Sequence, residues 1–396
     1  MAGAMIPRHY LSVVLALLQV STYVLSDCAA RKMAEHCGIG CQSNCHFELP
    51  KMAACTSSDS SSNRSVAYYE SWATVRPCDV FKPTDIDPSN WTHINFAFAI
   101  LDNSTHKIAL SASNDTELYN QTIALKSKKK DLKVYIAVGG WGVGGKPFSD
   151  MASSSSSRKA FIDSAAEFMD KYGFDGIDID WEYPAATDRG GKQADTNNLV
   201  SLLKELKDKL KGKKGITVTI PGGSYYMKGF DLKGMEPHID WVNIMSYDLH
   251  GSWDTPKLAQ PHTNLTEIDS SLDLLWSAGF PASKVTLGLA YYGHTFTLSN
   301  SSCSKPGCEA TGPGKKGECS GEAGTLINSE IKRIISDRKL KPVLDKTAGI
   351  KYMTWDNNQW VSYDDEETFK LKKDFANSKC LGGTMAWAVD MDSSSK

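Results

Sequence analysis

The stretch Asp175-Gly-Ile-Asp-Ile-Asp-Trp-Glu182 alternates acidic and apolar residues. Its carboxylates at Asp178, Asp180 and Glu182 recur at every second position. In a β-strand, residues two apart project from the same face, so these carboxylates share one face and the apolar side chains take the other. If the strand belongs to a barrel, one face lines the interior and the other packs against helices. The carboxylates are then expected to line the interior.

A row of three carboxylates on a buried face is costly, because desolvation and mutual repulsion oppose ionisation and raise at least one pKa. The arrangement suits general acid catalysis, in which one carboxyl group stays protonated near neutral pH. Glu182 is the candidate acid, since it lies at the C-terminal end of the predicted strand. A solvated acidic edge would need polar neighbours in place of Ile and Trp, and a calcium loop would need Gly where Tyr183 stands.

Short apolar, β-branched runs alternate with helical patterns along the rest of the chain, as expected for a parallel sheet built from βα units. Before the acidic strand, Phe161, Ala165, Phe168 and Tyr172 repeat at helical spacing, and Gly173 follows as a stop signal. Eight strands can close a (β/α)8 barrel, although a doubly wound open sheet would alternate similarly. The eight strands are predicted at residues 65–72, 93–100, 133–140, 176–182, 216–223, 241–248, 285–293 and 383–390.

The seventh and eighth predicted strands are separated by about ninety residues, many more than one helix and two loops need. We therefore predict a small α+β insertion between strand 7 and helix 7, at about residues 294–352. Cys303, Cys308 and Cys319 fall within it among Gly and Pro residues, where a disulfide would brace a loose loop.

The composition limits the classes of protein and partner. With 396 residues and 41% hydrophobic content, the chain can bury a full core. Its 44 basic and 46 acidic residues leave no net field that would attract nucleic acid or an anionic membrane. A neutral partner is expected, and no cofactor is predicted.

Residues 1–26 are interpreted as a secretory signal peptide, because Arg8 precedes an apolar run and small residues surround a plausible cleavage site. That run is shorter than the roughly 20 residues that a membrane-spanning helix needs. The ten cysteines fit secretion, since an oxidising compartment lets them pair. A zinc site is the rival interpretation, but no His-x-x-x-His pair accompanies them, and no metal is predicted. Sequons predict a glycosylated surface at Asn63, Asn90, Asn103, Asn114, Asn120, Asn264 and Asn300.

Two short segments precede the main domain. Residues 27–55 are cysteine-rich, and residues 56–65 form a Ser-rich stretch that resembles a linker. The main domain then spans residues 66–396. Little room for a final helix remains between the last predicted strand and Lys396, which would suit a fragment of a longer protein.

Four segments of the main domain resemble the strand motifs of glycoside hydrolase family 18, the chitinases. The acidic stretch matches the family's fourth-strand signature Asp-x-x-Asp-x-Asp-x-Glu. Three further segments are similar to the family's third-, sixth- and eighth-strand motifs, in this order: Ala137-Val-Gly-Gly-Trp141, Met245-Ser-Tyr-Asp248 and Gly383-Thr-Met-Ala-Trp387. The resemblance covers about residues 64–392 and implies a TIM barrel. Two positions depart from the family pattern: Ala137 stands where Ser is usual, and His294 where Arg is common.

The resemblance also implies roles for individual residues. Glu182 would donate a proton to the glycosidic oxygen, while Asp180 orients the substrate's N-acetyl group and Asp178 shares a proton with Asp180. The substrate's own acetamido oxygen, held by Tyr247, would attack in place of a protein nucleophile. Trp387 would form the floor under the sugar being cut, and core packing is the alternative for each aromatic residue. The other candidate sugar contacts are Trp141, Tyr183, Met245, Asp248, Gly140 and Tyr68.

The cysteine-rich segment has a resemblance of its own. Cys37-Gly-Ile-Gly-Cys-Gln-Ser-Asn-Cys45 is similar to the closing part of a hevein-type chitin-binding module, in which the equivalents of Cys41 and Cys45 are bonded to each other. A complete module has eight cysteines, so a disulfide-stabilised leader without a ligand is the alternative. Combined with a family 18 domain, the segment resembles fungal chitinases of the killer-toxin-like group.

The resulting hypothesis is a secreted, monomeric chitinase that cuts β-1,4 bonds in chitin or chitooligosaccharides by a retaining, substrate-assisted mechanism. A chitinase-like lectin or decoy would keep the groove without the chemistry, but such proteins usually lose the acid that is present here as Glu182. An endo-β-N-acetylglucosaminidase carries a similar acidic strand, whereas the insertion and the hevein-like segment favour chitin.

Overall fold

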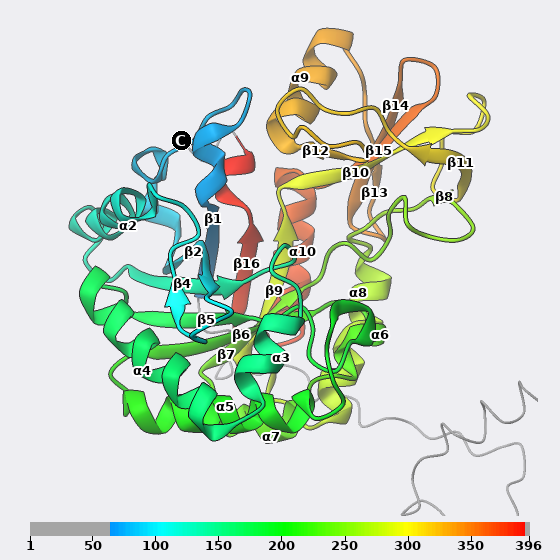
Figure 1. The fold of residues 1–396 in the computed structure, drawn as a ribbon. Coiled ribbons are helices and arrows are strands. Elements are labelled where there is room, and N and C mark those ends of the chain that lie inside the picture. Colours follow the sequence, from blue (N-terminus) through cyan, green and yellow to red (C-terminus); the bar gives the residue numbers. More distant parts are fainter. Residues whose placement is uncertain (1–63, 393–396) are drawn as a thin grey trace, which may run out of the picture. The chain divides into compact units, whose positions relative to one another are not determined.

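The computed structural model describes residues 64–392, and its central element is a closed barrel of eight parallel strands (Figure 1). The strands follow the order β1-β16-β9-β7-β6-β5-β4-β2, and the pairing of β1 with β2 closes the ring. The predicted (β/α)8 fold is therefore confirmed, and the open doubly wound sheet is excluded. The barrel strands are β1 (Arg64–Glu70), β2 (His93–Leu101), β4 (Lys133–Gly139), β5 (Gly176–Asp180), β6 (Gly215–Pro221), β7 (Trp241–Met245), β9 (Val285–Ala290) and β16 (Gly383–Trp387).

Helices surround the ring and cover its outer face (Figure 1). In the helix before β5, the side chain of Ser154 accepts a hydrogen bond from the backbone of Ser157, and Gly173, at φ +83°, ends the helix. Phe161 and Ala165 of this helix are buried, as their spacing predicts. The helices around the barrel are α2 (Asp115–Ala124), α3 (Lys146–Ala152), α4 (Ser155–Tyr172), α5 (Asp195–Leu210), α6 (Ser224–Met227), α7 (Leu232–Met235), α8 (Leu265–Ser277) and α10 (Glu366–Ser378).

Alternate residues of the strands build two separate cores. Ile177 and Ile179 of β5 are fully buried and belong to the large apolar cluster between strands and helices. Tyr68 of β1 and Met385 of β16 belong to a second cluster, inside the barrel. This alternation follows from strand geometry and turns Asp178 toward the interior, as predicted.

Most of the predicted strands run past the observed C-terminal ends. Strands predicted at 176–182, 241–248 and 383–390 end at Asp180, Met245 and Trp387. The last pair in the ladder between β4 and β5 is Gly139 with Asp180. Beyond these points the chain leaves the sheet, so the motif residues that follow lie in loops at the C-terminal end of the barrel.

The first strand also begins earlier than predicted. Arg64, expected in the linker at 56–65, and Ser65, which the predicted linker and the predicted strand shared, are both part of β1 and pair with Gly383 and Thr384 of β16. The prediction placed the boundary too late because Ser65 continues the Ser-rich run, whereas the sheet accepts any residue whose backbone can pair.

The predicted insertion between strand 7 and helix 7 exists, but it is wider than residues 294–352. Its sheet starts with β10 at Tyr292, one residue after β9, and continues to β15, which ends at Tyr363. β15 belongs to the insertion because it pairs with β10. The elements of this subdomain are β10 (Tyr292–Leu298), β11 (Cys308–Pro313), β12 (Thr325–Ile327), α9 (Asn328–Arg338), β13 (Val343–Asp345), β14 (Ile350–Trp355) and β15 (Gln359–Tyr363).

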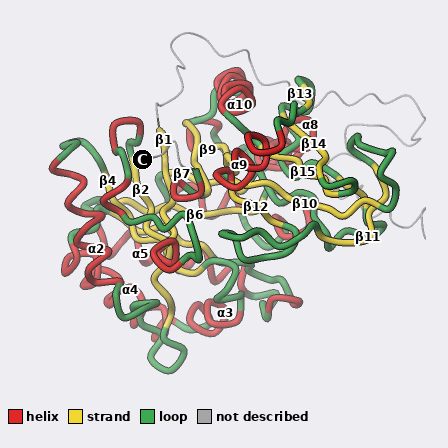
Figure 2. The backbone as a smooth tube through the Cα atoms, turned by 90° about the horizontal axis from the view of Figure 1, so that it is seen from above, coloured by secondary structure: helices red, strands yellow, loops and turns green. Residues whose placement is uncertain are grey.

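Two short strands complete the sheets. β8 (Leu258–Ala259) comes from the loop after β7 and pairs with β11 of the insertion. β3 (Ile108–Ala109) pairs antiparallel with the end of β2. Figure 2 shows β10 and β11 extending away from the barrel strands. The loop after β7 and the insertion therefore share one sheet.

Disulfides brace the insertion, as the cysteine positions predict. Cys303 bonds to Cys308 within the insertion. Cys319 bonds to Cys78, which follows β1 and lies 241 positions before Cys319 in the sequence. The signal peptide, the cysteine-rich segment with its predicted Cys41–Cys45 bond, and the linker up to residue 63 lie outside the described residues. Among the described helices, none is both long and apolar enough to cross a membrane.

Candidate active site

The acidic strand has small residues beside it. Asp178 and Asp180 of β5 stand opposite Ala137 and Gly139 of β4. Gly139 has φ +116°, and a Cβ atom there would lie 2.1 Å from the backbone oxygen of Asp180. A side chain at Gly139 would therefore collide with the backbone of the acidic strand.

Asp178 is fully buried inside the barrel and accepts hydrogen bonds from three strands. Tyr68 Oη donates to its Oδ2 at 2.6 Å, and Thr217 Oγ1 donates to its Oδ1 at 2.6 Å. Thr219 Oγ1 and Asn243 Nδ2 complete the set, each at 3.0 Å. Burial raises the pKa of Asp178, while these hydrogen bonds oppose the rise because they favour the carboxylate.

Asp180 lies one step further along the same face and is only 3% exposed. Its Oδ1 is buried and has no hydrogen-bond partner. Burial raises the pKa of Asp180 well above its ordinary value, and the negative charges of Glu182 and Asp178 add to the rise. An unpaired carboxyl oxygen is costly in a stable core, so this atom is a candidate for contact with a ligand.

Glu182 follows the end of β5 and is 7% exposed. Burial raises the pKa of Glu182 to about 7, against an ordinary value of 4.5. A hydrogen bond with Tyr183 lowers this pKa, the charge of Asp248 raises it, and Arg189 lowers it. The net effect is a carboxyl group that is substantially protonated near neutral pH, which is the state a general acid needs.

Tyr247 stands between the acidic residues and the eighth strand. Its hydroxyl lies 3.8 Å from the Sδ of Met385, and Met245 packs against the same interior cluster. Burial raises the pKa of Tyr247 well above its ordinary value, and the charge of Asp248 adds to this. The phenol therefore stays protonated and can donate a hydrogen bond.

Aromatic side chains gather around the end of β16. Trp387 stacks on Phe98 with ring centroids 5.6 Å apart, and it lies 5.4 Å from Tyr68. Trp72 approaches Trp387 at 6.3 Å and is 43% exposed. Gly140 packs under Phe98, because a Cβ atom at this position would lie 2.5 Å from that ring.

Two further predicted aromatics lie beside Glu182. Tyr183 is buried and stacks on Tyr226 with centroids 4.2 Å apart. Trp141 is 57% exposed, and the guanidinium of Arg189 lies 3.6 Å from its ring centroid. Arg189 also donates from Nε to the backbone oxygen of Glu182 at 3.2 Å, which connects Trp141 to the acidic row.

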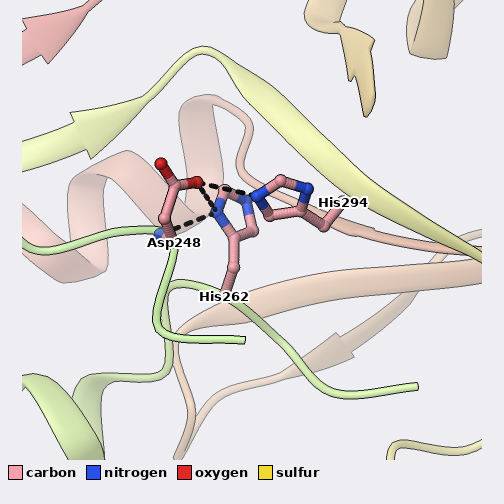
Figure 3. Close-up of side chains that lie close together, drawn as sticks. All are labelled: Asp248, His262 and His294. Atoms are coloured by element: carbon pink, nitrogen blue, oxygen red, sulfur yellow. Dashed lines mark hydrogen bonds and ion pairs between the residues drawn. The ribbon is translucent and has the colours of Figure 1, made fainter. Parts of the chain in front are cut away.

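Asp248 lies in the loop after β7, and its side chain is 49% exposed. It meets His262 and His294, which come from two other segments of the chain (Figure 3). Tyr292 Oη donates to Asp248 Oδ1 at 2.5 Å. Burial alone would raise the pKa of Asp248, but its contacts with both histidines lower it. Asp248 is therefore an accessible anion, and with the two histidines it forms a set of side chains that could hold a metal ion.

The structure brings the sequence-predicted residues to one end of the barrel, with Trp141 at the margin. Sequence reasoning named Tyr68 as a sugar contact, whereas its buried hydroxyl donates to Asp178. It missed Thr217 and Thr219, although they alternate with apolar residues in the same way as the carboxylates. It also missed Tyr292, which the insertion brings to Asp248, and His262, which the segment before α8 folds back onto Asp248. Chemically, the arrangement combines a protonated acid, a second carboxyl group, a phenol donor and exposed aromatic faces.

Comparisons with known proteins agree with this chemistry. The model of the family "Glycosyl hydrolases family 18" matches residues 64–392. Chitotriosidase-1 of Mus musculus is 34% identical over 83% of this chain and 73% of its own length.

Two solved structures resemble this chain. The Group IV chitinase of Ostrinia furnacalis in complex with allosamidin aligns with a TM-score of 0.79 and 29% identity, over 83% of this chain and 93% of that one. A mutant of catalytic domain 2 of the Group II chitinase of the same species, in complex with penta-N-acetylchitooctaose, aligns with a TM-score of 0.77 and 27% identity, over 83% and 90%.

The raised pKa of Glu182 makes the stability of the fold depend on pH. The folded state holds this proton more tightly than the unfolded chain, so the associated stability is present below pH 4.5 and is lost as pH rises through about 7. Glu182→Gln keeps the shape without the charge. We expect this variant to be more stable than the wild type at pH 8, by up to about 3 kcal/mol, and to show little difference at pH 4.

Urea unfolding at both pH values measures this difference. Glu322→Gln, which neutralises an exposed glutamate of the insertion, is the control and should leave stability unchanged at either pH. Equal stability of Glu182→Gln and wild type at pH 8 would show that Glu182 titrates at an ordinary pKa.

Proposed function

The chain belongs to glycosyl hydrolases family 18, and we propose that it hydrolyses β-1,4 bonds between N-acetylglucosamine units, with Glu182 as the acid. The observation that carries this proposal is the row of Asp178, Asp180 and Glu182 along one interior face of the barrel. Chitinases and a chitooligosaccharide complex among the similar proteins support the choice of substrate.

The first proposed step is cleavage of the glycosidic bond. Protonated Glu182 donates its proton to the bridging oxygen, so that the leaving sugar departs as a neutral alcohol. The acetamido oxygen of the sugar that is cut attacks its own anomeric carbon from the opposite side. A bond between carbon and oxygen breaks, another forms, and the product is a cyclic oxazolinium ion.

Asp180 and Tyr247 are proposed to stabilise this ion. The acetamido N–H becomes more acidic as the ring closes, and a carboxylate at Asp180 Oδ1 would accept its hydrogen bond, which suits an atom without a partner in the protein. Tyr247, which stays protonated, would donate to the acetamido oxygen. Asp178 would take over the proton that Asp180 releases, since burial raises the pKa of Asp178 as well.

The second proposed step restores the enzyme. Ionised Glu182 accepts a proton from water, and the water oxygen attacks the anomeric carbon and opens the ring. Two inversions at the same carbon give net retention of the β configuration. In this scheme no protein carboxylate bonds to the sugar.

Sugar binding is assigned to the groups at the barrel's C-terminal end. Trp387 would carry the sugar that is cut on its flat face, since pyranose C–H groups pack well on aromatic rings. Its ring is held by Phe98 and by Tyr68. We assign the remaining contacts to Trp141, Tyr183, Met245, Asp248 and Gly140.

The setting of the enzyme is also a proposal. We propose secretion of a monomer after removal of residues 1–26, with residues 27–55 as a partial hevein-like segment and with the catalytic domain beginning at Arg64. The sequons support passage through a secretory compartment, and Asn90, Asn103, Asn114, Asn120 and Asn300 are exposed. Membership of the fungal killer-toxin-like group belongs to this proposal.

The catalytic assignment predicts that Glu182→Gln abolishes hydrolysis while oligosaccharide binding survives. Gln has nearly the same shape but offers no acidic proton, and general acid catalysis contributes a factor of about 100 to 10,000. Turnover of chitooligosaccharides and of colloidal chitin, together with calorimetric binding, tests this, with Glu322→Gln as the active control. A Glu182→Gln variant that keeps more than about a tenth of the wild-type turnover would refute the assignment.

The mechanism predicts the stereochemistry of the first product. Proton NMR of a chitooligosaccharide digest, recorded before mutarotation, should show the β-anomer. Oligomers that lack the acetyl group on the sugar before the scissile bond should bind yet resist cleavage there, because a free amine has no attacking oxygen. An initial α-anomer, or efficient cleavage after the deacetylated sugar, would rule out participation of the acetamido group.

A further inference from the structure

Asp248, His262 and His294 form a cluster of potential metal ligands. One ligand atom from each lies within 4.8 Å of the others, and no second group of three such residues meets this test within residues 64–392. They come from the loop after β7, from the segment before α8, and from β10 of the insertion (Figure 3). Because His294 is 46 positions from Asp248, sequence spacing did not reveal the cluster.

The backbone fixes which ring nitrogens face Asp248. Nδ1 of His294 lies 3.1 Å from the carbonyl oxygen of Gly324, and Nε2 of His262 lies 3.3 Å from the carbonyl oxygen of Tyr292. A carbonyl oxygen only accepts hydrogen bonds, so these two nitrogens carry protons. In neutral rings, the nitrogens that face Asp248 therefore carry lone pairs. That of His294 lies 2.7 Å from Asp248 Oδ1, whereas that of His262 accepts the backbone N–H of Asp248 at 3.3 Å, a hydrogen bond that a bound cation would replace. A histidine that donates its other N–H to a backbone carbonyl is typical of metal sites.

The neutral state of His262 has independent support. Its Nδ1 lies 3.3 Å from the backbone N–H of Asp248 and accepts from it, which a protonated nitrogen could not do. This ring therefore carries its single proton on Nε2, and its Nδ1 lone pair becomes available to a cation when that hydrogen bond is released.

The two distances from Asp248 are close to those between the ligand atoms of a small tetrahedral cation. Asp248 Oδ1 lies 2.7 Å from His294 Nε2 and 3.5 Å from His262 Nδ1. Bonds of about 2.0 to 2.1 Å in tetrahedral geometry separate the ligand atoms of Zn²⁺ by about 3.3 Å. The distance to His262 is slightly longer than this, and the distance to His294 must widen by about half an ångström. A change in the side-chain torsions of Asp248 can supply that movement.

The coordination would stay open on one side. His262 and His294 are buried, whereas the Asp248 side chain is 49% exposed. Three protein ligands with a fourth, solvent-facing position is the pattern of open zinc sites, in contrast to closed structural ones.

We propose that Asp248, His262 and His294 bind one divalent transition-metal cation of the Zn²⁺ class, with water in the fourth position. The rival occupant is a second proton on His294, which would make the 2.7 Å contact an ion pair between an imidazolium and a carboxylate. Asp248 is also an assigned sugar contact and its charge raises the pKa of Glu182, so metal binding is measured directly and not through turnover.

The test is calorimetric titration of the chelator-treated full chain with ZnCl₂, and with CoCl₂ for the absorption bands of tetrahedral Co²⁺. We expect one site whose affinity falls at least about tenfold in His262→Gln and in His294→Gln. His294→Arg is the third variant, because it keeps a positive charge beside Asp248 but offers no ligand nitrogen, so it should fold and still lose the site.

His250→Gln is the matched control. His250 also lies between carboxylates, but both its nitrogens are engaged, with Asp254 and Glu267 at 2.8 Å each. Its hydrogen bond with Glu267 is the main cause that raises the pKa of His250 to about 9, so it is an imidazolium at neutral pH. Its variant should bind Zn²⁺ like the wild type. Two results would overturn the proposal. One is a zinc affinity that is the same in the wild type and in folded His294→Arg, and the other is a loss of affinity in His250→Gln as large as the loss in the ligand variants.

Discussion

The structure depends on one constraint, the alternation of side chains along a closed parallel barrel. Because every second residue of β5 faces inward, Asp178 and Asp180 share a buried interior with Glu182 just beyond the strand. The neighbouring strand places Ala137 and Gly139 at the level of the two aspartates. A side chain at Gly139 would collide with the backbone of Asp180.

The three carboxyl groups differ because their surroundings differ. Asp178 receives four hydrogen bonds from β1, β6 and β7, whereas Asp180 has a buried oxygen without a partner. Glu182 sits at the mouth of the barrel, where burial raises its pKa to about 7. The insertion also affects the pKa of Glu182. Tyr292 and His294 of β10 contact Asp248, and the charge of Asp248 raises the pKa of Glu182. The fold thus keeps ionisation unfavourable where a proton must be given away.

Local patterns in the sequence predicted the barrel and the carboxylate face. The side chains of a single strand alternate between its two faces, so the face that each residue takes can be predicted from that strand's sequence alone. The donors to Asp178 were not predicted, since Thr217 reaches it only through the register between β5 and β6. Strand ends were placed too late for a similar reason. Motif residues such as Ser246 and Asp248 look like a continuation of β7, but the ladder has already ended at Met245. Contacts between the loop after β7 and the insertion depend on tertiary folding, so neither β8 nor the neighbours of Asp248 could be read from spacing.

The pH dependence of kcat/KM on a neutral chitooligosaccharide tests the central claim most directly, because it reports the protonation of the acid in the free enzyme. The account predicts that kcat/KM declines as pH rises through about 7, since burial holds the proton of Glu182 to that point. A decline already centred at the ordinary glutamate value of 4.5, or no decline up to about pH 9, would contradict the account.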